Sequence, residues 1–249
     1  MTTARLLVLQ PDPSDPVGPL GRWLTEAGAD FDLRRLPDDP VPAAPDAYDG
    51  VVCLGGHMGA GDDEEYPWLA GLRDLLAGAV RSGVPTLGIC LGAQLLAAGT
   101  GGRVETGDAG PEAGASLVAK KDAAWNDPLF AELPLMPDVM HFHTDVITRL
   151  PGGAVLLASN PKYPNQAFRL HRSGYGIQFH IETTPQVVRH WADTSPEVAA
   201  TRPALVFDTA TLERHHADIE ETWRPFAARF VQLAAGALEP ATPPSLPLA

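Results

Sequence analysis

The feature that most constrains the fold of this chain is an apolar run that passes through a cysteine directly into a helical pattern. Residues 85–89 have the continuous apolar character of a buried strand, and residues 91–98 follow with helical spacing. Gly88 and Gly92 flank the cysteine between them, Cys90. Glycine lacks the Cβ atom that a tight strand-to-helix turn would crowd, so the sequence predicts a sharp turn with Cys90 at its tip.

Apolar runs and helical patterns alternate along the first hundred residues in the same way. Such alternation is typical of a parallel sheet with helices on both faces, so we expect an α/β three-layer sandwich with a mostly parallel central sheet. The predicted strands are 6–9, 31–36, 51–54, 85–89, 116–119, 139–143, 155–158, 166–170 and 176–179; the predicted helices are 20–28, 64–81 (with Asp62 or Asp63 as its cap), 91–98, 186–192 and 212–235.

Length and composition limit the domain organisation. A chain of 249 residues that is 45% hydrophobic can bury one sizeable core, and no internal repeat or linker divides it. We expect one domain over residues 1–239. Residues 240–249 are rich in proline and uncharged, and are predicted to form a mobile tail.

Charge excludes some classes of partner. The formal net charge is −13, which disfavours binding to a nucleic-acid backbone or to an anionic membrane surface. The chain shows no signal peptide and no apolar run long enough to span a bilayer, so a cytoplasmic location is expected. The two cysteines, Cys53 and Cys90, form no disulfide framework, and Cys53 is interpreted as a small buried hydrophobe.

The environment predicted for Cys90 suits a nucleophile. The helix that follows presents free N–H groups and the positive end of its dipole to the sulfur, which stabilises the thiolate. His180 and Glu182 are two residues apart in an extended pattern, so their side chains project from the same side. Glu182 could therefore orient His180 as the base, and these two with Cys90 form a predicted triad. Taken singly, each also has a structural interpretation: a buried inert cysteine, a core histidine and a carboxylate that caps a turn.

Acyl transfer also needs donors for the developing oxyanion. The backbone N–H of Leu91, directly after the nucleophile, is one predicted donor. Gly55-Gly56 follows another predicted strand, and Gly56 is the second candidate because glycine lets the backbone approach closely.

These motifs resemble those of class I glutamine amidotransferases, in the order of that family: Gly55-Gly56, residues 88–94 and residues 176–182. Residues 63–68 and 164–168 are similar to a stand-alone subgroup related to the glutaminase domain of GMP synthase. The resemblance implies a flavodoxin-like fold, no cofactor, and a γ-glutamyl thioester on Cys90. It also implies that Gly55, Gln94, His143 and Asp145 contact the substrate glutamine.

The sequence departs from the family pattern at three positions. Ile181 stands where the family has proline between the triad histidine and glutamate, and His57 stands where proline follows the glycine pair. Thr144 replaces a glycine near the pocket rim. The spacing of the triad residues is kept. The shape of the loop beside the oxyanion hole and the identity of the substrate can differ from those of the family.

A metal site is an alternative interpretation of one segment. His141, His143 and Asp145 would share a strand face, and two histidines with a carboxylate are common metal ligands. The family resemblance places this segment beside the glutamine pocket without a metal, so we expect none.

Three functions follow from these observations. The leading hypothesis is hydrolysis of a γ-glutamyl amide, with glutamine as the default substrate and any ammonia-accepting synthetase on a separate polypeptide, since no Walker A pattern is present. The second is a stand-alone hydrolase or peptidase for a γ-glutamyl conjugate. The third is a non-catalytic binding or regulatory module on the same fold.

Overall fold

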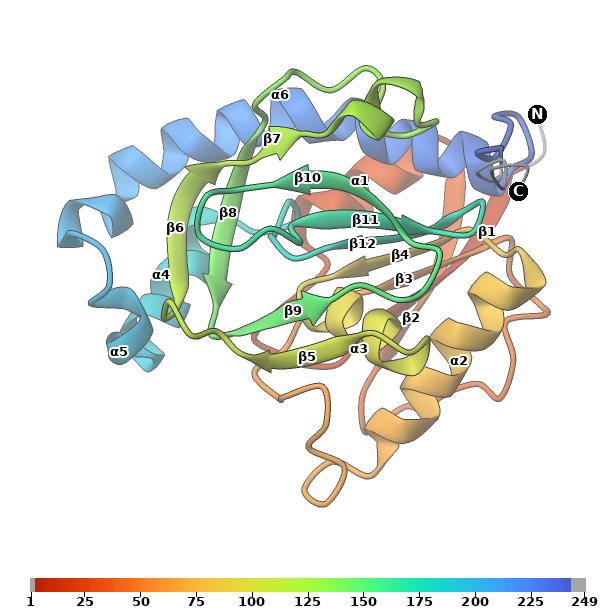
Figure 1. The fold of residues 1–249 in the computed structure, drawn as a ribbon, viewed down its shortest axis with the longest axis horizontal. Helices are drawn as coiled ribbons and strands as arrows, with labels where there is room; N and C mark the ends of the chain where they lie inside the picture. The colour runs from red at the N-terminus through yellow and green to blue at the C-terminus, as the bar shows by residue number, and fades with distance from the viewer. Residues whose placement is uncertain (1–2, 243–249) are drawn as a thin grey trace, which may run out of the picture.

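A computed structural model describes residues 3–242. Its central layer is one eight-stranded sheet with helices on both faces (Figure 1). From one edge to the other the strands are β2 (Ala29–Arg35), β1 (Ala4–Gln10), β3 (Gly50–Cys53), β4 (Thr86–Ile89), β12 (Gly174–Ile177), β11 (Ala167–Leu170), β10 (Val155–Ser159) and β7 (Ala119–Lys120). Strands β2 to β12 pair in parallel, and the last three pair antiparallel. The predicted α/β fold with a mostly parallel sheet is confirmed.

Strand β1 shows why the apolar run is continuous. Its side chains alternate between the two faces of the sheet, as the period of two requires. Leu6 and Val8 pack with helices α1 (Gly18–Glu26) and α6 (Thr209–Ala234), whereas Leu7 and Leu9 pack with α2 (Trp68–Ser82) and α3 (Leu91–Gly99). Both faces of residues 6–9 are therefore buried under helices, and the polar residues of β1, Arg5 and Gln10, lie toward its two ends.

Two smaller antiparallel sheets complete the molecule. Strand β6 (Glu112–Leu117) pairs with β8 (Asp138–His143), and β5 (Arg103–Thr106) pairs with β9 (Asp145–Arg149). An isolated bridge between Met140 and His180 joins β8 to the segment after β12. Figure 1 shows β6 and β8 side by side at one end of the molecule. The other helices are α4 (Pro185–Thr194), α5 (Pro196–Ala199) and two short 3₁₀ helices, Asp122–Asn126 and Ala204–Phe207.

Some boundaries differ from the prediction. Helix α2 begins at Trp68 rather than at residue 64, because Asp62 accepts a hydrogen bond from Gly59 and Asp63 pairs with Arg73, so neither caps the helix. Strand β12 ends at Ile177, which leaves His180 beyond the ladder. Strands β5 and β9 are absent from the prediction. Strand β5 is largely exposed and carries no apolar run, so the sequence pattern does not reveal it.

The ends of the described chain add two facts. Within residues 3–242 no helix is both long and apolar enough to cross a bilayer. Most of the predicted tail, residues 243–249, lies outside the described part of the chain. Ala241, at its start, is buried and forms two hydrogen bonds with Arg172, backbone to backbone at 3.1 Å and from Arg172 Nε at 3.2 Å.

Candidate active site

Cys90 stands at the turn where β4 passes into α3. Its backbone has φ of 50° and ψ of −108°, a conformation that residues with a side chain rarely adopt. The flanking glycines are required by close contacts. A Cβ atom on Gly88 would lie 2.5 Å from the carbonyl of Gly92, and one on Gly92 would lie 2.1 Å from the carbonyl oxygen of Cys53. The packing of α3 against β3 and β4 therefore holds the strained turn in place.

A cavity of about 320 Å³ lies at the carboxyl edge of the parallel strands. Strands β1, β3, β4 and β12 all end at this edge, which is where α/β sheets commonly bind ligands. Of the residues that the sequence analysis selected, the cavity is lined by Gly56, Cys90, Gln94, His143, Asp145 and His180, together with His57 and Thr144.

His180 and Glu182 form a buried pair. Nδ1 of His180 lies 2.6 Å from Oε1 of Glu182, and both side chains are almost fully enclosed. The backbone N–H of Ile181 donates to the other oxygen of Glu182 at 2.8 Å. A proline at position 181 could not make this bond, so the departure from the family pattern adds a contact that fixes the carboxylate.

The charges in this pair are coupled. Burial alone would lower the pKa of His180, but the negative charges that Glu182 and Cys90 carry when ionised raise it well above its usual range. Burial alone would raise the pKa of Glu182, but the charge and hydrogen bond of His180 lower it. The carboxylate of Glu182 therefore stabilises the imidazolium that forms when His180 takes up a proton.

Cys90 and His180 face the same cavity. Nε2 of His180, the nitrogen opposite the one that contacts Glu182, makes no hydrogen bond with any described residue. Cys90 and His180 both line the cavity of about 320 Å³, and Nε2 of Gln178 lies 3.9 Å from the Cys90 sulfur. The three members of the predicted triad are thus brought together from β4 and the segment after β12.

Asp15 is a buried carboxyl group beside this pair that the sequence analysis did not select. Its Oδ2 lies 3.9 Å from Nδ1 of His180, and its Oδ1 has no hydrogen-bond partner among the described residues. Burial and the charge of Glu182 raise the pKa of Asp15 well above its usual range. The sequence could have pointed to Asp15 through its position in the loop after β1, because that loop lies at the same sheet edge as Cys90.

The glycine pair lies against the triad. A Cβ atom on Gly55 would lie 2.0 Å from Oδ2 of Asp15 and 3.1 Å from the His180 ring, so only glycine fits there. Gly55 itself does not line the cavity, whereas Gly56 does. His57 is fixed by Asp12, whose Oδ2 lies 2.5 Å from Nδ1 of His57, and by the hydroxyl of Tyr66 at 3.0 Å from Nε2.

Gln94, His143 and Asp145 form one hydrogen-bonded group at the cavity wall. The backbone carbonyl of Asp145 accepts from Nε2 of Gln94 at 2.9 Å and lies 3.0 Å from Nδ1 of His143. The carboxylate of Asp145 accepts from Thr106 at 2.9 Å. These side chains are therefore held in place by protein contacts.

The sequence profile described as glutamine amidotransferase class-I matches residues 20–190, more than half of the chain. The chain belongs to the class I glutamine amidotransferase family. The resemblance drawn from the residues around Cys90 and His180 is thereby confirmed, and this class I domain includes the candidate site described above.

Individual relatives of this amidotransferase-family protein differ in their activities. The A subunit of glutamine-hydrolysing GMP synthase from Natronomonas pharaonis is 33% identical over 162 residues, which cover 65% of this chain and 79% of that subunit. Gamma-glutamyl peptidase 4 from Arabidopsis thaliana is 26% identical over 214 residues, or 84% of each chain. The chain spans only 27% of the longer GMP synthase from Christiangramia forsetii, to which it is 32% identical over 148 residues.

Solved structures show the same fold. A glutamine amidotransferase from Thermotoga maritima superposes with a TM-score of 0.81 at 30% identity. The match covers 93% of this chain and 100% of that one, so the similarity is to a stand-alone glutamine amidotransferase of comparable length.

Three groups of side chains within residues 3–242 have the composition of a metal site. Asp15, His180 and Glu182 form the first, and the partly exposed Asp138, His215 and Asp218 form the second. The third is the buried set Glu112, His141 and His143. The alternative ligand set of His141, His143 and Asp145, which the sequence analysis set aside, is not what the structure assembles: Glu112, from another strand, takes the place of Asp145. Burial lowers the pKa of His141 to about 3, so this imidazole is neutral.

Proposed function

We propose that this protein hydrolyses a γ-glutamyl amide, with Cys90 as the nucleophile, His180 as the general base and acid, and Glu182 as the group that orients His180. The observation that carries this proposal is the arrangement at one cavity of a cysteine on a strained strand-to-helix turn and a buried histidine held by a carboxylate. Membership of an amidotransferase family and similarity to a γ-glutamyl peptidase support the same chemistry.

The proposed reaction proceeds in two halves. Nε2 of His180 accepts the thiol proton, and the Cys90 sulfur attacks the γ-carbonyl carbon of the substrate. The backbone N–H groups of Leu91 and Gly56 stabilise the oxyanion of the tetrahedral intermediate. His180 then gives its proton to the departing amine, which leaves a γ-glutamyl thioester. Water attacks the thioester, His180 takes a proton from it, and that proton returns to the sulfur as glutamate departs.

Glutamine is the default substrate. The similarity to the GMP synthase A subunit supports this choice, because that protein is described as part of a glutamine-hydrolysing enzyme. In this case the ammonia released would pass to an acceptor-activating synthetase on a separate polypeptide. Gln94, His143 and Asp145 are the proposed contacts for the glutamyl part of the substrate, with Gly55 shaping the backbone behind them.

Mass spectrometry of the intact protein tests the nucleophile and the substrate class together. After brief mixing with glutamine and a panel of γ-glutamyl amides, followed by acid quench, we expect a γ-glutamyl adduct on the peptide that contains Cys90. The Cys53→Ser variant should form the same adduct, and Cys90→Ala should form none. Turnover that survives in Cys90→Ala would remove Cys90 from the mechanism. Glutamine binding without adduct or turnover would instead support a non-catalytic module.

A conjugate hydrolase is the second candidate, and the charge of the cavity indicates which conjugates would fit. The lining includes Asp145 and Glu197, and the described lining residues include neither lysine nor arginine. A leaving group that is neutral or cationic suits such a wall better than one that carries a carboxylate. The match to gamma-glutamyl peptidase 4 over 84% of both chains supports this class as well.

Steady-state kinetics on matched substrates separates the two candidates. The panel contains free glutamine, a γ-glutamyl amine with a cationic leaving group and a γ-glutamyl peptide with an anionic one. Higher kcat/KM for the cationic conjugate than for glutamine would select the conjugate hydrolase. Fast turnover of glutamine alone would select the glutaminase.

A further inference from the structure

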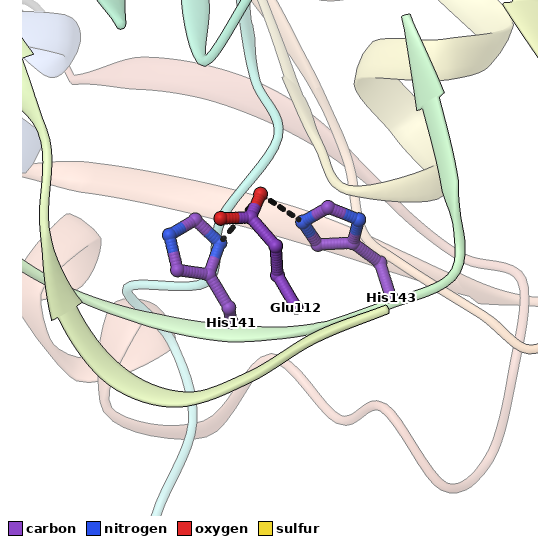
Figure 2. Close-up of side chains that lie close together, drawn as sticks. All are labelled: Glu112, His141 and His143. Atoms are coloured by element: carbon purple, nitrogen blue, oxygen red, sulfur yellow. Dashed lines mark ion pairs between the residues drawn. The ribbon is translucent and has the colours of Figure 1, made fainter. Parts of the chain in front are cut away.

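A second buried polar cluster lies beside the candidate active site, and two of its three members, Glu112 and His141, have no part in the proposed mechanism. It joins Glu112 of β6 to His141 and His143 of β8, and Glu112 lies opposite His143 in the register of these strands. Figure 2 shows the two imidazoles on either side of the Glu112 carboxylate. We propose that these three side chains bind one divalent transition-metal ion of the zinc type.

The distances fit a shared ion. Oε2 of Glu112 lies 3.3 Å from Nε2 of His143 and 4.0 Å from Nδ1 of His141 (Figure 2). The three ligand atoms all lie within 4.8 Å of one another. Zinc bonds to imidazole nitrogen and carboxylate oxygen are about 2.0–2.2 Å long, so two ligands of one ion lie up to roughly 4 Å apart. Small rotations of the side chains are enough to close the site.

The hydrogen bonds of His143 leave its Nε2 as the metal-facing atom. Nδ1 of His143 contacts the backbone carbonyl of Asp145, which can only accept, so Nδ1 carries the proton. Whenever the ring is neutral, Nε2 presents a lone pair, and this atom makes no hydrogen bond although it lies 3.3 Å from Oε2 of Glu112. An imidazole lone pair beside a carboxylate oxygen repels it, and a cation between the two reverses that repulsion.

His141 gives an independent indication. Its side chain is 1% exposed, and neither ring nitrogen has a hydrogen-bond partner among the described residues. Buried polar groups in native proteins are nearly always paired, so a histidine with two bare nitrogens calls for an explanation. Coordination of an ion by Nδ1, the nitrogen that faces Glu112 in Figure 2, supplies it.

The surroundings also suit a metal ligand set. Oε1 of Glu112 accepts from Asn160 at 2.7 Å, and Oε2 accepts from Gln166 at 2.8 Å. Such hydrogen bonds orient ligating carboxylates in metal proteins, as the carbonyl on Nδ1 orients His143. Two imidazoles and one carboxylate favour zinc and its neighbours over calcium or magnesium, which prefer oxygen ligands.

The other two candidate groups lack these properties. In the first, Nδ1 of His180 and Oε1 of Glu182 already bond each other at 2.6 Å, so these two atoms are not available to an ion. In the second, Asp138, His215 and Asp218 are only partly buried, and solvent can satisfy them. His143 also lines the 320 Å³ cavity, so an ion would enter the buried cluster from the candidate active site. Three protein ligands leave a coordination position for water or another ligand.

Metal titration tests the proposal without an activity assay. The protein is prepared without a histidine tag, treated with a chelator, desalted and titrated with Co²⁺, whose visible absorption reports its ligands. The Cys90→Ser background removes the one cavity thiol that could bind the ion. We expect a single saturable site per chain that Zn²⁺ displaces.

Two substitutions and one control locate the site. Glu112→Gln and His141→Gln should each weaken binding at least tenfold, since loss of even an outer hydrogen-bond partner of a metal ligand costs about 10–100-fold. His215→Gln, in the partly exposed group, should bind as the parent does. Circular dichroism of each variant confirms that it is folded.

A measurement on the unsubstituted side chains keeps the test decisive if a variant fails to fold. Imidazole nitrogen NMR of the Cys90→Ser protein should show Zn²⁺-dependent shifts at His141 and His143. The proposal is overturned if no saturable binding occurs, if both folded variants bind as tightly as the parent, or if the shifts fall on His180 or His215 instead.

Discussion

Nδ1 of His180 lies 2.6 Å from Oε1 of Glu182, in a position where both side chains are almost fully buried. Ile181, between them, donates its backbone N–H to the second oxygen of the same carboxylate. Three successive residues therefore form one hydrogen-bonded unit, and the free nitrogen of the imidazole is left for the cavity. The proposed reaction depends on this unit.

Glu182→Gln keeps the shape of the carboxylate and removes its charge. We expect kcat for γ-glutamyl hydrolysis to fall by about 10²–10⁴-fold, because the amide no longer stabilises the imidazolium. The pKa of His180 should fall as well, since the charge of Glu182 raises it. Steady-state kinetics and an NMR titration of His180 measure the two effects. Glu220→Gln removes the charge from a surface ion pair with Arg22 and keeps an amide oxygen for the indole N–H of Trp23, so it is the matched control and should leave both unchanged. An unaltered titration of His180 in Glu182→Gln would contradict the electrostatic role.

Cys90→Gly and Cys90→Ala should both be inactive but differ in stability. Holding a residue with a side chain in a sparsely populated backbone conformation costs about 1–3 kcal/mol. Glycine at φ of 50° relieves that strain. It also lowers stability by about 0.5–1 kcal/mol, because a glycine loses more conformational entropy on folding than alanine does. We expect the glycine variant to be more stable than the alanine variant by about 1 kcal/mol. Urea denaturation measures this difference, and equal stabilities would show that the turn is unstrained.

The gain in free energy of unfolding that Asp15→Asn produces should increase as the pH rises. The pKa of Asp15 is raised by burial and by Glu182, so the folded carboxyl stays protonated at pH values where the unfolded one ionises. The contribution of this carboxyl group to the free energy of unfolding is therefore fully present below about pH 4. It is lost as the pH rises toward the folded pKa. Asparagine does not titrate, so the stability gain of the variant should grow as the pH rises from about 4 toward the folded pKa of Asp15.

Asp12→Asn is the control of opposite sign for Asp15. Burial raises the pKa of Asp12, but hydrogen bonds from His57 and Ser14 lower it below its usual value. The ionised form is thus favoured in the folded state, and its contribution is present above the unfolded pKa. Asp12→Asn should lower the free energy of unfolding at neutral pH. A gain from Asp15→Asn that is the same at every pH would rule out titration as its cause.

Gly92→Ala tests the close approach of α3 to β3. The added Cβ atom would lie 2.1 Å from the Cys53 carbonyl oxygen, so the helix must shift. We expect a loss of at least about 1–3 kcal/mol in the free energy of unfolding, as in other overpacked cores. Gly71→Ala, at an exposed position of α2 with no atom near the new Cβ, should instead gain about 0.5–1 kcal/mol from helix propensity. Thermal or urea denaturation of both variants gives the comparison, and equal effects would refute the contact.

The sequence predicted the parts of the molecule that depend on neighbouring residues. The apolar run before Cys90 and the glycines around it specify a strand, a turn and a helix, because each requirement acts within a few residues. His180 and Glu182 are likewise two residues apart, and this short spacing keeps their side chains close. The end of β12 could not be read in this way, since the ladder with β4 stops at Ile177 and residues 178–182 form bends around the bridge from His180 to Met140.

Tertiary structure decided which distant residues join these local units. Asp15 reaches His180 because β1 and β12 are parallel strands of one sheet, and Glu112 reaches His141 and His143 because β6 and β8 pair in a particular register. Periodicity in a sequence fixes only which side chains of one element share a face. The contact between two elements depends on their order and register, which the packing of the whole core determines.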